Sequence, residues 1–277
     1  MKIKFWGCRG SIPVPDIRMM KYGGDTTSVE IDLDGELFLI DAGTGIRKLG
    51  ESLLKRKIYN FNVFVTHSHW DHIQGFPFFT PIYSEKAKIH VIGCTNSYKQ
   101  LKDILSSQMS YEFFPISFHD LKSKITFSEV CSNQLTINGY KIKTIQTNHA
   151  IFTSAVRIEK NGKSFVFMTD NELESKNPIN PRRKFIEFCK GADYLIHDSQ
   201  FTDAEYTYRK NWGHSTFEQS IKLAEEARVK NLGFFHHDPN RKDTDLAALS
   251  RKYCSLSHSN GYKFKIFTVK QMDEIRL

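Results

Sequence analysis

Residues 66–72 read T-H-S-H-W-D-H, which places three histidines and one aspartate close together in the chain. They come directly after the apolar run at 63–65, which is typical of a buried strand. Imidazole nitrogens and carboxylate oxygens are the usual ligands of zinc and its neighbours in the first transition row. The stretch therefore predicts part of a metal site at the end of a strand.

Other histidine and aspartate residues also follow predicted strands. They are His149 after 141–146, Asp170 after 164–168, Asp198 after 194–197 and His236 after 231–235. Polar side chains at the carboxyl ends of strands form the sites of open α/β and layered folds. One catalytic zinc needs three protein ligands and an open position. This larger set predicts two divalent ions about 3.5–4 Å apart that share a carboxylate and a hydroxide.

In the rest of the chain, apolar patterns typical of strands alternate with apolar patterns typical of helices. Further strands are expected at 2–6, 28–33, 36–40, 89–92 and 154–159. Helices are expected around Ile46, Leu49 and Leu53, at 97–107, between Pro181 and Gly191, and after the capping-box pattern Ser215-x-x-Glu218. The alternation predicts an α/β fold.

Length and composition are those of a globular protein with a sizeable core. The chain has 277 residues, of which 40% are hydrophobic and 25% charged. No run approaches the roughly 18 apolar residues of a membrane span. The N-terminus reaches arginine and glycine too early for a secretory signal. We therefore expect a cytoplasmic protein without a membrane partner.

Charge and cysteine content give weaker indications. The formal net charge is +8 and the isoelectric point about 9.1, which favours anionic substrates or partners. The basic residues are spread out, however, as on an ordinary solvated surface. The five cysteines form no C-x-x-C pair, so we expect reduced, structural thiols. They are Cys8, Cys94, Cys131, Cys189 and Cys254.

The motif H-x-H-x-D-H, followed by a lone histidine, a lone aspartate and a last histidine, resembles the metallo-β-lactamase superfamily. The resemblance covers nearly the whole chain. It implies a four-layer αββα sandwich, formed here by a single domain over 1–277 with an aromatic, lid-like insert at about 93–126. It also implies two bound divalent metal ions, with Zn²⁺ expected and Mn²⁺ or Fe²⁺ as alternatives.

Matched position by position, the resemblance implies a complete set of metal ligands. They are His67, His69 and His149 for one ion, Asp71, His72 and His236 for the other, and Asp170 as the bridging carboxylate. His236 is preferred over its neighbour His237, because strand alternation turns adjacent side chains to opposite sides. Asp41, in D-A-G-T-G, is expected to accept the second N–H of a metal-binding histidine.

Three later segments, I-H-D-S-Q-F-T, N-W-G-H-S-T-F-E and G-F-F-H-H-D-P-N-R, resemble the phosphodiesterase branch of the family, which includes ribonuclease Z. In that branch the histidine of G-H-S-T, here His214, contacts the scissile phosphate and donates a proton to the leaving oxygen. The acidic residue of the H-[DE] pair, here Asp198, supports it. His214, Asp198 and Asp71 are therefore the expected catalytic residues.

The substrate is harder to predict. The chain shows no Gly- and Pro-rich arm of the kind that grips tRNA, and its opening G-C-R-G-S resembles bacterial hydrolases similar to cyclic-nucleotide phosphodiesterases. We therefore expect a small or cyclic phosphodiester as substrate. A tRNA 3′-processing endoribonuclease and a thioester or lactone hydrolase remain alternatives. The sequence leaves the oligomeric state open, a homodimer included.

The aromatic segment at 109–118 has two interpretations. It reads M-S-Y-E-F-F-P-I-S-F and could belong to the core. Alternatively, it forms a lid or wall of the substrate pocket, in which Phe113 or Phe114 stacks on a base.

Overall fold

The computed structural model describes residues 1–95, 99–131, 133–137, 139–259 and 261–277. They divide into two compact units, each formed around one seven-stranded sheet. Unit 1 comprises Met1–Val14, Gly24–Cys131 and Gln271–Arg276. Unit 2 comprises Pro15–Gly23, Ser132–Lys270 and Leu277.

The sheet of unit 1 has the strand order β14-β1-β2-β3-β4-β5-β6. Its strands are β1 (Lys2–Gly7), β2 (Ser28–Leu33), β3 (Glu36–Ile40), β4 (Asn60–Val65), β5 (Lys88–Gly93), β6 (Lys124–Glu129) and β14 (Glu274–Arg276). The pairs from β14 to β3 are antiparallel, and those from β3 to β6 are parallel. Parallel neighbours end at the same edge of a sheet. The residues after β3 and β4 are therefore brought close together.

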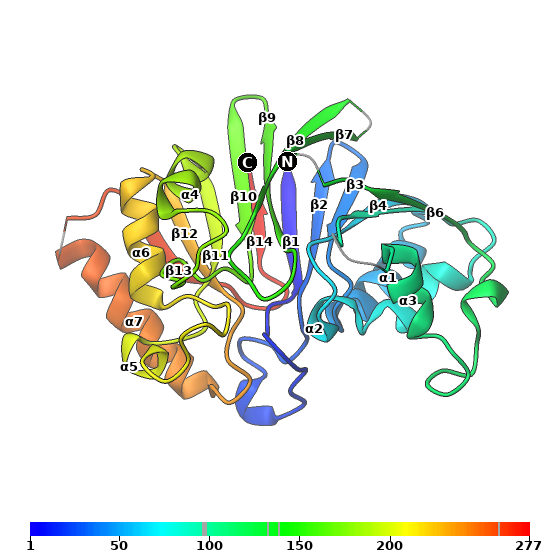
Figure 1. Cartoon of the computed structure of the whole chain (residues 1–277), viewed down its shortest axis with the longest axis horizontal. Coiled ribbons are helices and arrows are strands. Elements are labelled where there is room, and N and C mark those ends of the chain that lie inside the picture. The colour runs from blue at the N-terminus through cyan, green and yellow to red at the C-terminus, as the bar shows by residue number, and fades with distance from the viewer. Residues whose placement is uncertain (96–98, 132, 138, 260) are drawn as a thin grey trace. The chain divides into compact units, whose positions relative to one another are not determined.

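Helices cover the sheet of unit 1 (Figure 1). They are α1 (Gly45–Lys55), α2 (Trp70–Ile73), α3 (Leu101–Ser107) and the 3₁₀ turns η2 (Phe76–Phe78), η3 (Thr80–Tyr83) and η4 (Phe118–Asp120). The predicted apolar face of α1, with Ile46, Leu49 and Leu53, is fully buried. It packs in one cluster with strand residues such as Val63 and Val91.

The sheet of unit 2 has the order β13-β12-β11-β10-β9-β8-β7. Its strands are β7 (Gln134–Ile137), β8 (Tyr140–Gln146), β9 (Ser154–Lys160), β10 (Lys163–Met168), β11 (Tyr194–Asp198), β12 (Asn231–Phe235) and β13 (Lys265–Thr268). The pairs from β7 to β10 are antiparallel, and those from β10 to β13 are parallel. The ends of β10, β11 and β12 therefore share one edge.

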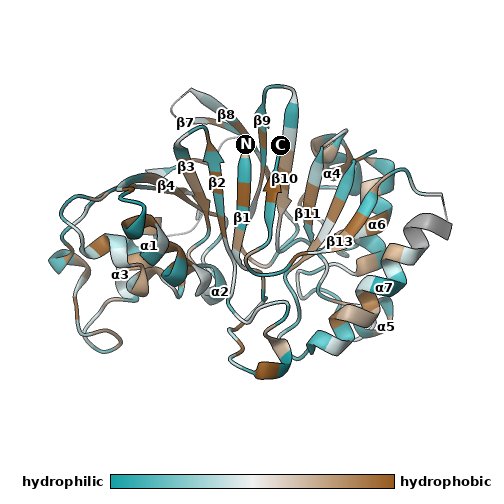
Figure 2. Ribbon diagram, turned by 180° about the vertical axis from the view of Figure 1, so that it is seen from behind, coloured by the Kyte–Doolittle hydropathy of each residue, from teal (hydrophilic) through white to brown (hydrophobic). Residues whose placement is uncertain are grey.

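The helices of unit 2 are α4 (Arg182–Cys189), α5 (Asp203–Tyr206), α6 (Phe217–Glu226), α7 (Asp243–Ser259) and the turn η1 (Ile17–Met19). Phe185 of α4, Phe217 of α6 and Tyr253 of α7 pack in one buried cluster with Val166 and Leu195 of the sheet. The hydropathy colouring agrees, because hydrophobic residues are concentrated along the strands while α7 shows both colours (Figure 2).

The structure confirms the predicted strands, but two helices begin at later residues than predicted. The helix expected at 97–107 begins at Leu101, and residues 96–98 lie outside the described residues. The capping box is formed by Thr216 and Gln219, one position later than expected. Ser215 is unavailable for capping, because its hydroxyl donates to Asn171 O at 2.5 Å and accepts from Leu173 N at 3.1 Å.

The expectation of five reduced cysteines is wrong for one pair. Cys94 and Cys131 form a disulfide with their Cα atoms 5.1 Å apart. They follow the ends of β5 and β6, which are parallel neighbours with Gly93 paired to Glu129. Because β6 is not among the predicted strands, the sequence alone does not indicate that the two cysteines meet. Cys8 and Cys189 are thiols whose pKa burial raises to about 12.

The aromatic segment at 109–118 has features of both interpretations. Met109 is buried in the core of unit 1, and the half-buried Phe114 packs against the same cluster. Phe113, in contrast, is 79% exposed and Tyr111 73%. The segment is therefore attached to the core at some positions and offers aromatic surface at others. Among the described residues, no helix combines the length and apolar character needed to cross a membrane.

Candidate metal centre

The histidine-rich stretch after β4 forms a compact group in unit 1. The ring of His67 lies 4.7 Å from that of His69 and 4.1 Å from that of His72. Asp71 belongs to the same group, because its Oδ2 is 3.4 Å from Nε2 of His72. His67, Asp71 and His72 are buried, whereas Trp70 between them is 78% exposed. The short helix α2 thus turns the candidate ligands inward and the indole outward.

Asp41, which follows β3, contacts this group. Its Oδ2 lies 2.7 Å from Nδ1 of His72 and accepts a hydrogen bond from the hydroxyl of Thr66, and its Oδ1 accepts one from the amide of Thr66. Asp41 is fully buried and has a left-handed backbone, with φ of 61°. Burial raises the pKa of Asp41, and the neighbouring His72 opposes that effect. With Nδ1 of His72 engaged, its Nε2 is the atom that faces Asp71.

A second group lies in unit 2 around Asp170. Oδ1 of this carboxylate is 3.4 Å from Nε2 of His236, 3.8 Å from Nε2 of His149 and 3.9 Å from Nδ1 of His214. Its Oδ2 accepts the hydroxyl of Thr169 at 2.6 Å. Asp170 and His236 both follow a strand in a left-handed conformation, with φ of 52° and 61°. One carboxylate oxygen therefore faces three imidazoles.

The other ring nitrogens in unit 2 have protein acceptors. Nδ1 of His149 lies 3.0 Å from the carbonyl of Gly213, and Nδ1 of His236 lies 3.0 Å from Oε1 of Gln200. These contacts leave Nε2 of each ring directed at Asp170. His237 points elsewhere, because its Nε2 lies 2.7 Å from the carbonyl of Val269. Of the two neighbours, His236 is therefore the one that lies against Asp170.

His214 and Asp198 form a pair beside that group. Nδ1 of His214 lies 2.7 Å from Oδ2 of Asp198, and the His214 ring stacks on that of His236 at 4.8 Å. Asp198 is fully buried and also accepts the backbone amides of Asn171 and Gln200. The carboxylate is therefore held in place independently of the imidazole that it contacts.

His197, next to Asp198, has a different role. It is fully buried, its Nδ1 lies 2.6 Å from the carbonyl of Asp198, and its Nε2 is 3.3 Å from the side-chain nitrogen Nδ2 of Asn171. Burial lowers the pKa of His197 to about 4. It is a neutral ring that stabilises the end of β11.

The donor sets suit a divalent cation. Imidazole and carboxylate are zinc ligands, and metal-bound histidines usually engage their second ring nitrogen with a carboxylate or a carbonyl. Here Asp41 and the carbonyl of Gly213 supply such contacts. The ligand atoms of His149, Asp170 and His214 also lie within 4.8 Å of one another. Thr66, Gln200 and Gly213 lie within the motifs singled out in the sequence, but their contacts with Asp41, His236 and His149 could not be predicted from it.

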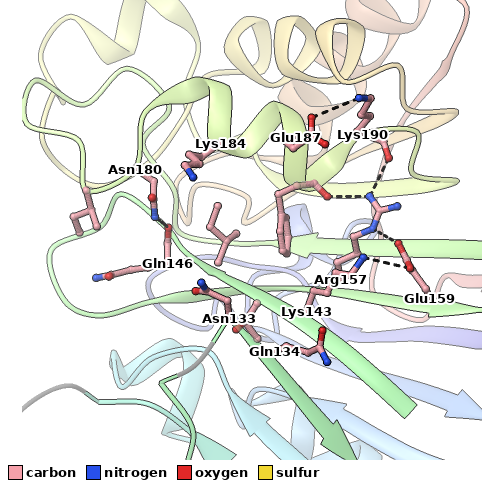
Figure 3. Close-up of a pocket in the computed structure, with 14 residues that line it drawn as sticks. Asn133, Gln134, Lys143, Gln146, Arg157, Glu159, Asn180, Lys184, Glu187 and Lys190 are labelled. Atoms are coloured by element: carbon pink, nitrogen blue, oxygen red, sulfur yellow. Dashed lines mark hydrogen bonds and ion pairs between the residues drawn. The ribbon is translucent and has the colours of Figure 1, made fainter. Parts of the chain in front are cut away.

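A hollow of about 810 Å³ in unit 2 is separate from these groups (Figure 3). It is lined by β7, β8, β9 and α4, and none of the predicted site residues contributes to it. Most of its charged side chains are engaged with one another or with backbone carbonyls. Arg157 pairs with Glu159 at 2.7 Å and donates to the carbonyls of Phe188 and Lys190, and Lys190 pairs with Glu187 at 3.6 Å. We therefore do not assign the chemistry to this hollow.

Comparison with known proteins agrees with the fold. Residues 37–237 match the model of the beta-lactamase superfamily domain. Ribonuclease Z of Pyrococcus abyssi is 22% identical over 92% of this chain and 92% of its own length. A diphosphatase of the PhnP family has a TM-score of 0.72 at 18% identity, covering 100% of this chain and 97% of that one. The short form of human tRNase Z has a TM-score of 0.69 at 19% identity, covering 100% and 99%.

The chain belongs to the beta-lactamase superfamily, and the predicted metallo-β-lactamase fold is confirmed. It is a metal-dependent hydrolase, and the curated relatives that it resembles are ribonucleases Z.

Proposed function

We propose that the chain is a phosphodiesterase that uses two divalent metal ions, Zn²⁺ in the first instance, to hydrolyse a small or cyclic phosphodiester. The proposed ligands are those that the family resemblance implied: His67, His69, Asp71, His72, His149, Asp170 and His236. The observation that carries the proposal is the pair of His214 and Asp198, 2.7 Å apart beside the Asp170 group. A hydrolase with a positioned imidazole can protonate a poor leaving group.

The metal ligands and the pair of His214 and Asp198 would have different tasks in the reaction. Divalent metal ions neutralise charge on the phosphate oxygens and activate water at neutral pH. Asp198 accepts the Nδ1 proton of His214, which leaves Nε2 to carry the proton that the leaving alkoxide needs. Asp41 and the carbonyl of Gly213 would orient the histidine ligands.

The sequence supports the small substrate, because it shows no Gly- and Pro-rich arm of the kind that grips tRNA. The names of the relatives and the net charge of +8 favour the second candidate, a tRNA 3′-processing endoribonuclease.

Elemental analysis followed by a substrate panel tests the proposal. We expect two metal ions per chain, and fewer in His67→Ala. We expect turnover of bis(p-nitrophenyl) phosphate and of cyclic nucleotides in preference to precursor tRNA. At most one ion, unchanged in His67→Ala, would contradict the dinuclear site. Cleavage of precursor tRNA with a steep salt dependence would establish the second candidate instead. Activity on thioesters or lactones alone would exclude both.

A further inference from the structure

Glu172 lies two residues beyond Asp170 and is 2% exposed. Its carboxylate accepts three hydrogen bonds: from the phenol of Tyr206 at 2.7 Å, from the amide of Asn211 at 2.7 Å and from the amide of Gly213 at 3.1 Å. Hydrogen bonds to a charged acceptor are about twice as strong as neutral ones. Glu172 is therefore strongly tied to the loop at 211–213.

That loop lies directly against two residues of the candidate site. The carbonyl of Gly213 lies 3.0 Å from Nδ1 of His149, and His214 is the next residue in the chain. A Cβ atom added to Gly213 would lie 2.1 Å from Nδ1 of His149, and the glycine has φ of 85°. The backbone at Gly213 therefore places the carbonyl that lies against Nδ1 of His149, and it also sets the position from which the His214 side chain extends.

The same loop gains little from packing. Trp212, between the two amides that Glu172 binds, is 61% exposed, and Tyr208 just before the loop is 89% exposed. Asn211 also has a left-handed backbone with φ of 67°, a conformation that costs free energy outside glycine. A polar restraint from the interior must hold such a loop, and Glu172 supplies it.

Glu172 is itself fixed to the segment before His149. Its amide donates to the carbonyl of Asn148 at 2.9 Å, and the side chain of Asn148 donates to the carbonyl of Glu172 at 3.2 Å. Burial and the nearby Glu172 carboxylate raise the pKa of Tyr206, so the phenol stays a proton donor to it. Glu172 therefore links the three chain segments that carry His149, Asp170 and His214.

We propose that Glu172 is a positioning residue: by holding the loop at 211–213 it directs Nε2 of His149 toward the metal and places His214 for proton transfer. The role assigned to His214 rests on the proposed function. Both carboxylate oxygens of Glu172 accept hydrogen bonds, whereas a glutamine has one acceptor and one donor group. Glu172→Gln would therefore set an NH₂ group against a donor and release part of the loop.

The test compares Glu172→Gln with Glu174→Gln, which removes an exposed carboxylate from the same segment. Two readouts do not depend on activity. They are the hydrogen exchange of the Asn211 and Gly213 amides, measured by NMR on the metal-free protein, and the affinity for Zn²⁺ in competition with a chelator. The third is the ratio of kcat for a diester with an alkyl leaving group to kcat for bis(p-nitrophenyl) phosphate.

In Glu172→Gln we expect both amides to exchange at least tenfold faster and the Kd for Zn²⁺ to rise 10–100-fold. The kcat ratio should fall at least tenfold, and Glu174→Gln should match the wild type in all three. If Glu172→Gln does not fold, Glu172→Asp serves instead, because its shorter side chain cannot reach both amides.

A lower melting temperature without a change in exchange or Zn²⁺ affinity would overturn the proposal, since Glu172 would then be a structural residue only. Faster exchange with unchanged Zn²⁺ affinity would refute its action on His149. If the wild type hydrolyses no phosphodiester, the proposed function fails, and exchange and Zn²⁺ affinity still decide the effect of Glu172 on the loop and on His149.

Discussion

Nδ1 of His72 lies 2.7 Å from Oδ2 of Asp41, a residue 31 positions earlier in the chain. Asp41 follows β3 and His72 lies in α2 after β4, and those two strands are parallel neighbours. The same carboxylate accepts the amide and the hydroxyl of Thr66, the first residue after β4. One buried carboxyl group therefore contacts both the end of the strand and the candidate ligand.

Asp41→Asn should weaken metal binding while preserving the fold. Asparagine has the same shape and tolerates a left-handed backbone, but it lacks the charge that holds Nδ1 of His72. We expect a 10–100-fold loss of Zn²⁺ affinity in competition with a chelator. The matched control is Asp34→Asn, an exposed aspartate that also has a positive φ, of 58°. Equal affinities in both variants would contradict the orienting role of Asp41.

His214→Ala should lower turnover by about a hundredfold or more, because general acid catalysis contributes on the order of 10² to 10⁴. The metal content should stay at the wild-type level. The loss should be smaller for bis(p-nitrophenyl) phosphate, whose leaving group needs little protonation. The exposed His119→Ala is the control. A His214→Ala protein that loses metal would show that His214 is a ligand rather than an acid.

Alanine substitutions at the two adjacent phenylalanines of the 109–118 segment should distinguish a lid position from a core position. Phe113 is 79% exposed, so Phe113→Ala should leave the melting temperature unchanged and raise KM for cyclic nucleotides if it stacks on a base. Phe114 is half-buried, with its ring 5.4 Å from that of Phe78. Phe114→Ala should lower stability by about 1–3 kcal/mol. An unchanged KM in Phe113→Ala would exclude Phe113 as a base-stacking residue.

Reduction of the disulfide between Cys94 and Cys131 should destabilise the protein. The bridge closes a loop with a sequence separation of 37, which contains the aromatic segment. A cross-link of this length restricts the unfolded chain and typically contributes about 2–4 kcal/mol. Urea unfolding of the double variant Cys94→Ser, Cys131→Ser should show a loss of that size, and Cys254→Ser should not. Thiol titration of the denatured, unreduced protein should find three free thiols, and five would instead support the original expectation of reduced cysteines.

Stability should decrease as the pH falls from neutral toward 4, in part because of His197. Its pKa in the folded protein is lowered to about 4, below an unfolded value of about 6.5. Between these values the unfolded chain binds a proton that the folded chain excludes, so the folded state loses stability there and is unaffected above pH 6.5.

We expect His197 to account for about 2 kcal/mol of the loss between pH 7.5 and pH 5. Urea unfolding of the wild type and of His197→Gln at both pH values measures this contribution as a difference. Parallel pH dependences in the two proteins would mean that His197 is charged in the folded state.

The sequence by itself determined where the strands lie and which histidine and aspartate residues follow them. Apolar periodicity is a local property, so the strands at 28–33, 36–40 and 231–235 could be predicted at their observed bounds. The grouping of His67, His69, Asp71 and His72 also follows from the sequence, because a strand end and one short helix hold them together. The proposed ligand set still depends on the family resemblance.

Only the tertiary structure decided which distant residues meet. Asp41 with His72, Gly213 with His149 and Glu172 with the loop at 211–213 are separated by 31 to 64 positions. Their contacts depend on which strands become neighbours and on how long loops return, and neither leaves a periodic signal in the sequence. The disulfide was missed for the same reason, since it follows from the parallel pairing of β5 and β6. A buried carboxylate such as Glu172 has a partner only once the chain has folded around it, because its charge is satisfied by backbone amides that every residue except proline carries.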